Sequence, residues 1–250
     1  MFNQDIITSY GIALVRKTTN KNNINNYEIL FINKRLSYAY ITFIKGIYNR
    51  NNDNDILRLF NNMTIDEKFC IMSLNFNIMW YKSVLSLPYN NKYSSKEIAK
   101  FEKCKNRFER SFLLDDGKRL LSLIKKSKSS KKVWEIPKGM NNRNESDINA
   151  AIREFNEETN IKKNKYKLLY DIKPITHIFT DDNITYKYIY FIGILLDNKY
   201  IPQIDLNVNN HIMETSDMQF FSVDNYKILI NDLKMVNVMK NIIKIAKNYF

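Results

Sequence analysis

The spacing of apolar residues changes twice along the chain, and these two changes constrain its fold more than any other feature. Residues 8–17 contain an apolar run and residues 27–35 alternate between apolar and polar side chains, which predicts two β-strands joined by a polar turn. From residue 36 to residue 126 the spacing becomes helical, over roughly 90 residues. Further strands are then expected at residues 134–139, 168–179, 186–196 and 218–223, followed by a long helix at 225–249.

This order of elements predicts a discontinuous α/β domain. Residues 1–35 and 127–250 are expected to form that domain, and residues 36–126 to form a helical domain inserted after its first two strands. Thr64 and Glu67 have the spacing of a capping box at the start of one helix of the insert. Its expected apolar stripes are Ile56, Leu57, Leu59, Phe60 and Met63 in one helix, and Phe69, Met72 and Leu74 in the next.

Three glutamates share one face of a helix that is expected over residues 146–159. Glu154, Glu157 and Glu158 stand at i, i+3 and i+4, so their carboxylates project together. Magnesium or manganese would offset the repulsion between them, because these hard cations choose oxygen ligands. The helix is therefore a candidate metal site, with a solvated acidic face as the alternative. Its other expected features are a cap at Ser146 or Asp147 and a buried stripe of Ile148, Ala151, Ile152 and Phe155.

This helix and the loop before it resemble the signature of the Nudix hydrolases. That signature runs Gly, five residues, Glu, seven residues, Arg-Glu, an apolar residue, any residue, Glu-Glu, any residue, Gly and an apolar residue. The positions that match at the required spacing are Gly139, Glu145, Arg153, Glu154, Phe155, Glu157, Glu158 and Ile161. One position departs, because Asn160 stands where the family has its final glycine. That glycine ends the helix in a left-handed conformation, for which asparagine is the next best residue.

The resemblance implies an α/β/α sandwich in which the signature lies against a mixed sheet, and a phosphoanhydride as the bond that is broken. It implies that Arg153 is structural and pairs with Glu145. The catalytic base is left open between Glu154 and Glu214. The implied ligands of Mg²⁺ or Mn²⁺ are Gly139, Glu145, Glu154, Glu157 and Glu158, with Asp181 as a further candidate. Asp181 and Asp182 are equally explained as residues of an ordinary solvated turn.

The chain is strongly basic, with 39 Lys and Arg residues against 26 Asp and Glu residues, a formal charge of +13 and a pI of about 9.5. Nucleic acid is the expected partner, ahead of an anionic membrane surface or a polyphosphate. Lysine that merely keeps the protein in solution is the alternative. The candidate RNA-binding residues are Lys92, Lys96, Lys100, Lys103, Lys105, Arg107, Lys131, Lys132 and Lys138. Those from Lys92 to Arg107 recur at helical intervals and are expected to share one face.

Segments outside the signature are similar to the Nudix decapping enzymes of African swine fever virus and related large DNA viruses. These segments are residues 60–65, 79–81, 134–139 and 186–191, and the similarity extends through the helical insert. It implies that the insert contributes to RNA binding and to a homodimer, and that the reaction releases 7-methyl-GDP from capped mRNA. Diphosphoinositol polyphosphates are further implied substrates. The host cytoplasm is the implied location, with the virion and the surface of the endoplasmic reticulum as additional ones.

Three functions are therefore compared: a metal-dependent mRNA-decapping hydrolase, a Nudix hydrolase of small diphosphates, and a non-catalytic RNA-binding module. The third is weak because no acid is missing from the signature. Between the first two, the basic insert favours long RNA. Trp134, Phe179, Tyr186, Tyr188 and Tyr190 are candidates for stacking on a methylated guanine, although alternating aromatic residues in a strand more often belong to a core.

Overall fold

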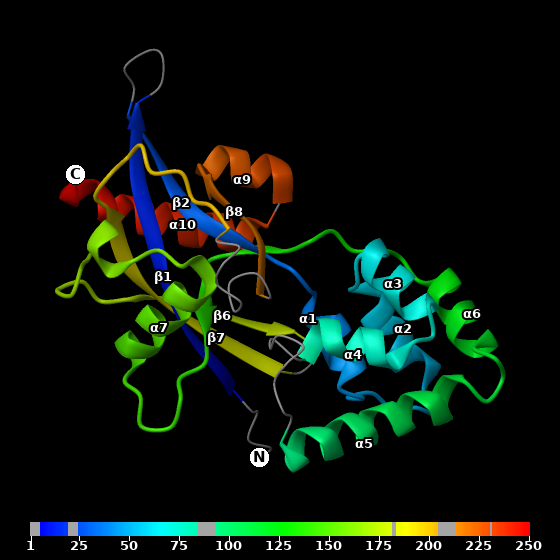
Figure 1. The fold of residues 1–250 in the computed structure, drawn as a ribbon. Helices are drawn as coiled ribbons and strands as arrows, with labels where there is room; N and C mark the ends of the chain where they lie inside the picture. Colours follow the sequence, from blue (N-terminus) through cyan, green and yellow to red (C-terminus); the bar gives the residue numbers. More distant parts are fainter. Residues whose placement is uncertain (1–5, 20–24, 85–93, 182–183, 205–213, 231) are drawn as a thin grey trace, which may run out of the picture. The chain divides into compact units, whose positions relative to one another are not determined.

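The computed structural model describes residues 6–19, 25–84, 94–181, 184–204, 214–230 and 232–250. The chain divides into two compact units (Figure 1). One unit, the sandwich, comprises Met1–Asn33 and Trp134–Phe250, and the other, the helical unit, comprises Lys34–Val133.

In the residues that the structure describes, the sandwich is built on one mixed sheet of eight strands. Its strands are β1 (Ile6–Thr19), β2 (Asn25–Lys34), β3 (Trp134–Glu135), β4 (Lys138–Gly139), β5 (Tyr166–Leu168), β6 (Ile175–Asp181), β7 (Ile184–Leu195) and β8 (Thr215–Phe221). The central strand β1 pairs parallel with β7, in a register that runs from Ile6 opposite Thr185 to Val15 opposite Ile194. β1 also pairs antiparallel with β2 and with the short β4, while β5 and β6 pair antiparallel with β7.

Helices cover both faces of this sheet, because the strands alternate apolar residues towards two separate cores. Ile12, Leu14 and Leu30 pack on one face with Ala151 and Phe155 of α7 (Asp147–Thr159). The alternate residues of β1 and β2 point to the opposite face and form the second core, together with α9 (Val223–Ile230) and α10 (Leu233–Ala246). Short 3-10 helices lie at Lys163–Lys165 and Lys247–Tyr249. The predicted α/β/α sandwich is therefore confirmed.

The single long helix expected at residues 225–249 is wrong, because the chain forms α9 and α10 there instead. Asp232 caps the start of α10, and its carboxylate accepts hydrogen bonds from the backbone N–H groups of Lys234 at 3.0 Å and Met235 at 3.1 Å. An aspartate in this position satisfies N–H groups that a continuous helix would bond to carbonyls. The apolar period continues across the break, which is why periodicity did not reveal it.

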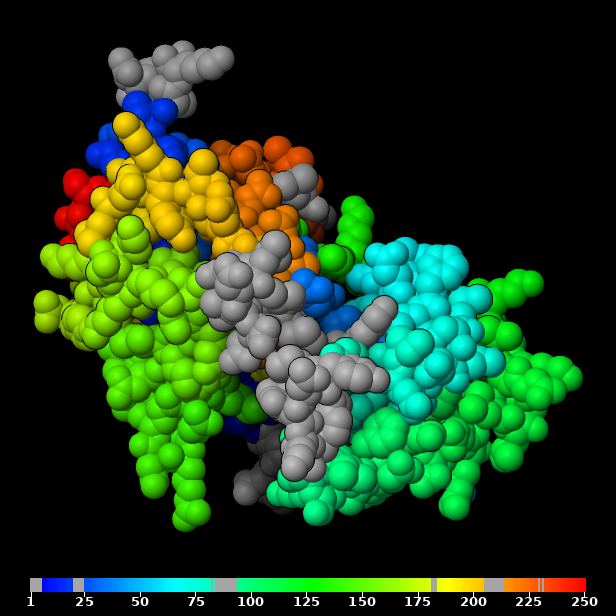
Figure 2. Space-filling view, viewed as in Figure 1, coloured from blue at the N-terminus to red at the C-terminus, as the bar shows by residue number. Residues whose placement is uncertain are grey.

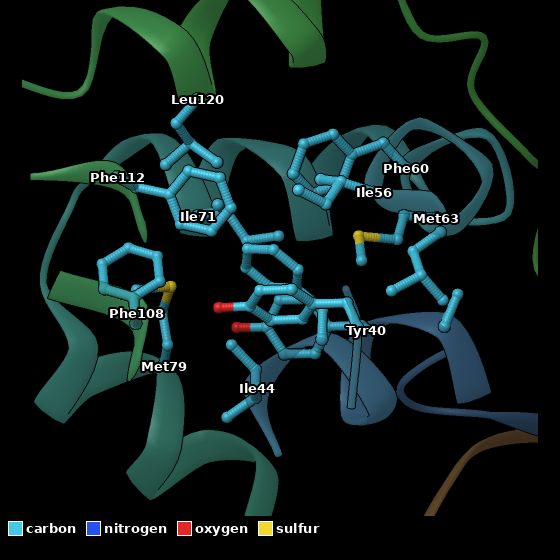
Figure 3. Close-up of a cluster of buried hydrophobic side chains, with 14 of the residues drawn as sticks. Tyr40, Ile44, Ile56, Phe60, Met63, Ile71, Met79, Phe108, Phe112 and Leu120 are labelled. Carbon is cyan, nitrogen blue, oxygen red and sulfur yellow. The ribbon is translucent and has the colours of Figure 1, made fainter. Parts of the chain in front are cut away.

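The helical unit contains six helices in the part of the chain that the structure describes. They are α1 (Tyr38–Ile44), α2 (Asp53–Asn61), α3 (Ile65–Met72), α4 (Phe76–Val84), α5 (Ser95–Phe112) and α6 (Lys118–Lys126). Their apolar faces meet in a core of their own (Figure 3). The Phe43 ring lies near its centre, with ring centroids of Phe60 at 5.1 Å and Phe112 at 5.6 Å. This unit thus has an apolar core that needs no residue of the sandwich.

The capping box at the start of α3 is confirmed, but the stripe expected from Phe69 and Met72 is wrong. Thr64 accepts a hydrogen bond from the N–H of Glu67, and the Glu67 carboxylate bonds back to the N–H of Thr64 at 2.8 Å. Phe69 is 62% exposed and Met72 41% exposed. α3 instead buries Lys68 and Ile71 one position away, because Lys68 has a polar partner inside the unit.

That partner is the lysine–serine stretch after α6. Lys68 Nζ donates a hydrogen bond to Ser127 Oγ at 2.7 Å and another to the carbonyl of Lys128. Ser130 N donates to the carbonyl of Met63 at 2.9 Å. These bonds join the segment after α6 to the helical unit, which extends to Val133. The apolar pattern had predicted that the sandwich resumes at residue 127.

α5 is the longest helix of the helical unit, and much of it lies at the surface in the space-filling view (Figure 2). Its buried residues include Phe108 and Phe112, while most of its lysines and arginines are exposed. Within the described ranges, no helix is both long and apolar enough to cross a membrane.

Candidate active site

The acidic residues of the signature are held by α7. The helix begins after Ser146, which adopts extended backbone angles but makes no side-chain capping bond, so the expected hydroxyl cap is wrong. It ends at Asn160, whose φ of 52° and ψ of 18° are left-handed, as the resemblance implied for this position. Ala150 joins Ala151 and Phe155 among the buried residues, while Ile148 and Ile152 are only partly buried. One side of α7 is thereby fixed to the sheet, and the other carries the carboxylates.

Arg153 lies among these carboxylates and bonds to three of them. Its guanidinium donates to Glu145 through both Nε and Nη2 at 2.9 Å, to Glu154 at 2.6 Å and to Glu157 at 3.3 Å. The Glu145 carboxylate also accepts from the N–H of Asn142 at 2.8 Å, and these bonds hold its pKa below the usual range. The bidentate pair closes the signature loop onto the helix, which is the pairing that the sequence analysis expected.

The Glu154 carboxylate is pressed against the backbone of the signature loop. A Cβ atom at Gly139 would overlap this carboxyl group, so only glycine permits the approach. The side chain of Glu154 is 14% exposed, and burial raises its pKa, with Glu157 and Glu214 adding to the rise and Arg153 opposing it. Glu154 therefore combines a largely buried carboxyl group with a raised pKa.

Glu157 and Glu158 differ strongly in exposure although they are neighbours. Glu157 is 37% exposed, whereas Glu158 is 1% exposed and accepts a hydrogen bond from the N–H of Lys138 at 2.9 Å. The hydroxyl of Thr215 donates to the Glu158 carbonyl at 2.8 Å. Sequence reasoning missed Thr215, and no motif spacing marks it, because the contact joins β8 to the end of α7. The hydrogen bond between the Glu158 carboxylate and the N–H of Lys138 thus joins α7 to the signature loop.

The set of donors suits a hard divalent cation, since it consists of carboxylate oxygens beside a glycine backbone. Among the residues that the structure describes, no three acidic, histidine or cysteine side chains already form a metal-binding group. The Arg153 guanidinium is ion-paired with Glu145, Glu154 and Glu157. Glu154 and Glu157, with Glu145 and Gly139, are the residues that could hold a cation at this position.

The two further candidate acids, Glu214 and Asp181, have different outcomes. Glu214 immediately precedes β8, is exposed, and lies close enough to Glu154 to raise the pKa of that carboxyl. Asp181 is the last residue of β6, and its side chain lies outside the described part of the structure, as does all of Asp182. The structure thus brings Glu214 to the acidic cluster.

The expected basic residues are distributed over both units. Lys96, Lys100, Lys103 and Arg107 follow one exposed side of α5. Lys105 points elsewhere, with its ammonium 5.7 Å from the Phe101 ring, because it is out of phase with the others. Lys138 belongs to the sandwich, and its side chain is 8% exposed and ion-paired with Glu135. Lys131 and Lys132 lie in the segment after α6, and Lys92 lies outside the described residues.

The candidate stacking residues pack against one another. Phe179 and Tyr186 are stacked at a centroid distance of 5.3 Å, and Tyr188 lies 5.2 Å from Phe179. Tyr190 is fully buried in the core, and Trp134 contacts the edge of Phe221 at 5.0 Å. Their packing explains these aromatic residues as parts of the sheet and its core.

Replacement of Gly139 by alanine should reduce phosphoanhydride hydrolysis by about 100-fold, because the added Cβ displaces the Glu154 carboxyl by an ångström or more. The melting temperature should change little, since the displaced group is the end of a side chain. Asn141→Ala, in the same loop but exposed, is the control. Wild-type turnover of Gly139→Ala would show that the placement of Glu154 against the loop does not matter.

Comparisons with known proteins show which family and which relatives the chain resembles. The NUDIX domain family model matches residues 110–244. The mRNA-decapping protein g5R of one African swine fever virus isolate is 33% identical over 249 residues, which is 97% of this chain and 96% of the relative. The g5R protein of another strain is 36% identical over 222 residues, 87% of this chain and 84% of the relative. A putative mRNA-decapping protein of Acanthamoeba polyphaga mimivirus is 30% identical over 194 residues, 68% of this chain and 52% of the relative.

Proposed function

The chain belongs to the Nudix family and is a pyrophosphohydrolase, and from this premise we propose that it removes the cap of mRNA. The substrate is capped RNA, and the bond that breaks is a phosphoanhydride of the cap. The products are 7-methyl-GDP and an RNA with a 5′-monophosphate. Nudix hydrolases generally use divalent metal ions such as Mg²⁺ or Mn²⁺, and we include such an ion in the proposal.

The observation that supports this substrate most directly is the extent of the similarity. The identity to a protein named for mRNA decapping covers 97% of this chain, so it includes the helical unit and not only the signature. The signature by itself is shared by hydrolases with many different substrates. The g5R relative matches the helical unit as well as the signature, so the similarity is more specific than membership of the Nudix family.

The acidic cluster supplies the chemistry. Hydrolysis of a phosphoanhydride spreads negative charge over phosphoryl oxygens, and a bound divalent cation would stabilise that charge. Glu154, Glu157 and Glu145 would hold the cation, with the backbone of Gly139. Arg153 keeps the loop closed through its bidentate pair with Glu145. Glu154 and Glu214 remain the two candidates for receiving the proton of the attacking water.

The helical unit supplies the affinity for RNA in this proposal. Lys96, Lys100, Lys103 and Arg107 present a row of cations on α5. Cations that contact phosphates release counterions, so the binding of RNA should weaken steeply as salt is added. RNA recognised in this way is bound irrespective of its base sequence.

RNA carrying a labelled cap is the decisive substrate. With manganese present, the wild-type protein should release labelled 7-methyl-GDP, and it should act faster on capped RNA than on a free cap dinucleotide, which has no RNA chain for the helical unit to bind. An inositol pyrophosphate is tested in parallel. Hydrolysis of the inositol pyrophosphate without any release of label from capped RNA would refute decapping and favour a hydrolase of small diphosphates.

A further inference from the structure

The helical unit contains an open cavity with unusually dense positive charge. Its volume is about 360 Å³, and it lies between α5 and the segment that joins α1 to α2. Among the described residues, the five that line it are four cations and one amide, with no carboxylate: Arg50, Lys103, Asn106, Arg107 and Arg110. Three of the cations come from one helix at i, i+4 and i+7, and the fourth comes from the opposite wall.

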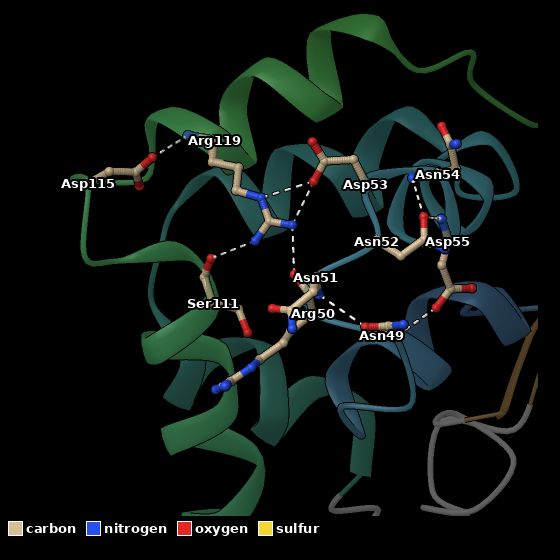
Figure 4. Close-up of polar contacts among 10 residues, drawn as sticks. All are labelled: Asn49, Arg50, Asn51, Asn52, Asp53, Asn54, Asp55, Ser111, Asp115 and Arg119. Carbon is tan, nitrogen blue, oxygen red and sulfur yellow. Dashed lines mark hydrogen bonds and ion pairs between the residues drawn. The ribbon is translucent and has the colours of Figure 1, made fainter.

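The two walls are held together by a residue that does not line the cavity. Arg119 of α6 donates to the carbonyl of Arg50 at 2.7 Å and to the carbonyl of Ser111, in α5, at 3.3 Å. It also donates two hydrogen bonds to the Asp53 carboxylate, from Nε at 3.0 Å and from Nη2 at 2.6 Å. Figure 4 shows this fork between the two walls, with the Arg50 side chain leaving its segment on the side of α5. The position of Arg50 relative to α5 is therefore fixed by the fold.

One lining cation is also held in place before any ligand arrives. The guanidinium of Arg107 donates to the carbonyl of Tyr48 and lies 5.2 Å from the centre of the Tyr48 ring. A Cβ at Gly46 would press on the Arg107 side chain, so the glycine leaves room for this arrangement. An arginine that is already oriented loses less side-chain entropy when it binds an anion.

Further cations stand just outside the cavity. Burial lowers the pKa of Lys45, and the charge of Lys100 lowers it further. Burial raises the pKa of the Cys104 thiol, whereas Lys100, Lys103, Arg107 and Lys45 act on it in the opposite direction. Lys45 and Lys100 repel each other, and a bound polyanion would reduce this repulsion.

We propose that this cavity is a binding site for two or more adjacent phosphate groups, and that RNA provides them. The volume equals that of about a dozen water molecules at ~30 Å³ each, so it admits more than one phosphate group. Arginine forks match phosphate oxygens in pairs, which the scattered lysines of α5 cannot do. The assignment to RNA rests on the proposed decapping function, whereas the phosphate chemistry of the site does not.

Binding measured in EDTA, where no turnover occurs, tests the site apart from the catalysis. The variant Arg50→Gln with Arg110→Gln removes two lining charges from opposite walls. Its dissociation constant for a single-stranded RNA should rise at least tenfold at low salt. The slope of log Kd against log salt should fall by about 1.4, since each lost phosphate contact removes ~0.7. Inorganic tripolyphosphate should displace RNA from the wild type and should bind the variant much more weakly.

Two double variants with the same loss of charge serve as controls. Lys240→Gln with Lys244→Gln removes two exposed cations from α10 and should change neither RNA nor tripolyphosphate binding. Lys96→Gln with Lys100→Gln removes two cations from α5 outside the cavity, and should weaken RNA binding while tripolyphosphate still binds. The proposal is overturned if Arg50→Gln with Arg110→Gln binds both probes as the α10 variant does. Loss of tripolyphosphate binding alone would overturn RNA as the source of the phosphates.

A substitution that keeps the charge of Arg119 tests whether the position of the cavity walls matters in addition to their charge. Arg119→Lys keeps the cation but loses the fork that joins Arg50, Asp53 and Ser111. Its affinity for tripolyphosphate should fall severalfold although the cavity keeps all its charges. Unchanged affinity would show that the clamp of the walls is irrelevant to the site. If wild-type protein fails to decap RNA but binds both probes through Arg50 and Arg110, the function is refuted and the site remains.

Discussion

Glu154→Gln should lower the turnover of capped RNA by 100-fold or more, the range in which loss of a group that positions or moves a proton falls. The carboxylate is pressed against Gly139 and bonded to Arg153, so an amide of the same size fits the space but has no charge with which to hold a cation. The core face of α7 is unaffected, because it consists of Ala150, Ala151 and Phe155. RNA binding in EDTA and the melting temperature should therefore remain close to wild type.

Two further variants sharpen this test. Asp171→Asn removes an exposed carboxylate of the sandwich and should leave turnover unchanged. Glu214→Gln separates the two candidates for the base. Glu214 is the base if two results are obtained together. Glu214→Gln must reduce turnover as much as Glu154→Gln does, and additional manganese must partly restore the turnover of Glu154→Gln. Glu154 then acts by holding the cation. Wild-type turnover by Glu154→Gln in saturating manganese would contradict the site as described.

Phe60→Ala should destabilise the helical unit by about 3–5 kcal/mol, because it empties the space of a fully buried ring in contact with Phe43. Two tryptophans permit the two units to be followed separately. Trp80 is buried in the helical unit, and Trp134 lies in the sandwich against Phe221. In a Trp134→Phe background, urea unfolding followed by fluorescence should show a large shift to lower urea. In a Trp80→Phe background the transition of the sandwich should move much less.

Phe69→Ala is the matched control, since it removes the same ring from a side chain that is 62% exposed. It should change the stability by no more than about 0.5 kcal/mol. An equal cost for Phe60→Ala and Phe69→Ala would contradict the described core of the helical unit. Equal shifts of both tryptophan signals would show that the two units unfold as one.

Much of the fold could be predicted because local chemistry and tertiary packing agree. Thr64 and Glu67 form a capping box in the sequence and in the structure, and Asn160 ends α7 in the left-handed conformation that its side chain tolerates. The signature glutamates were found because a fixed spacing on one helix places them together. In each case the interaction joins residues only a few positions apart, so the sequence carries it directly.

The features that could not be predicted depend on contacts between distant residues. The apolar period predicted that Phe69 faces the core, but α3 buries Lys68 instead, and Lys68 is hydrogen-bonded to Ser127. The charge of Lys138 suggested RNA binding, yet its side chain is buried against Glu135. The proximity of Arg50 and Arg110 could not be predicted, because it depends on the hydrogen bonds of Arg119. Sequence spacing carries no information on such neighbours.

The parallel pairing of β1 with β7 bears on the order in which the protein can assemble during synthesis. β1 leaves the ribosome first, but its parallel partner is made only after the entire helical unit. Strands so far apart in sequence pair slowly, whereas the helices form from local contacts. We expect the helical unit to be compact while β1 still has one apolar edge uncovered, and such an edge is prone to aggregate. Lowering the temperature during expression should therefore reduce aggregation through this edge before β7 is made, because hydrophobic association weakens on cooling.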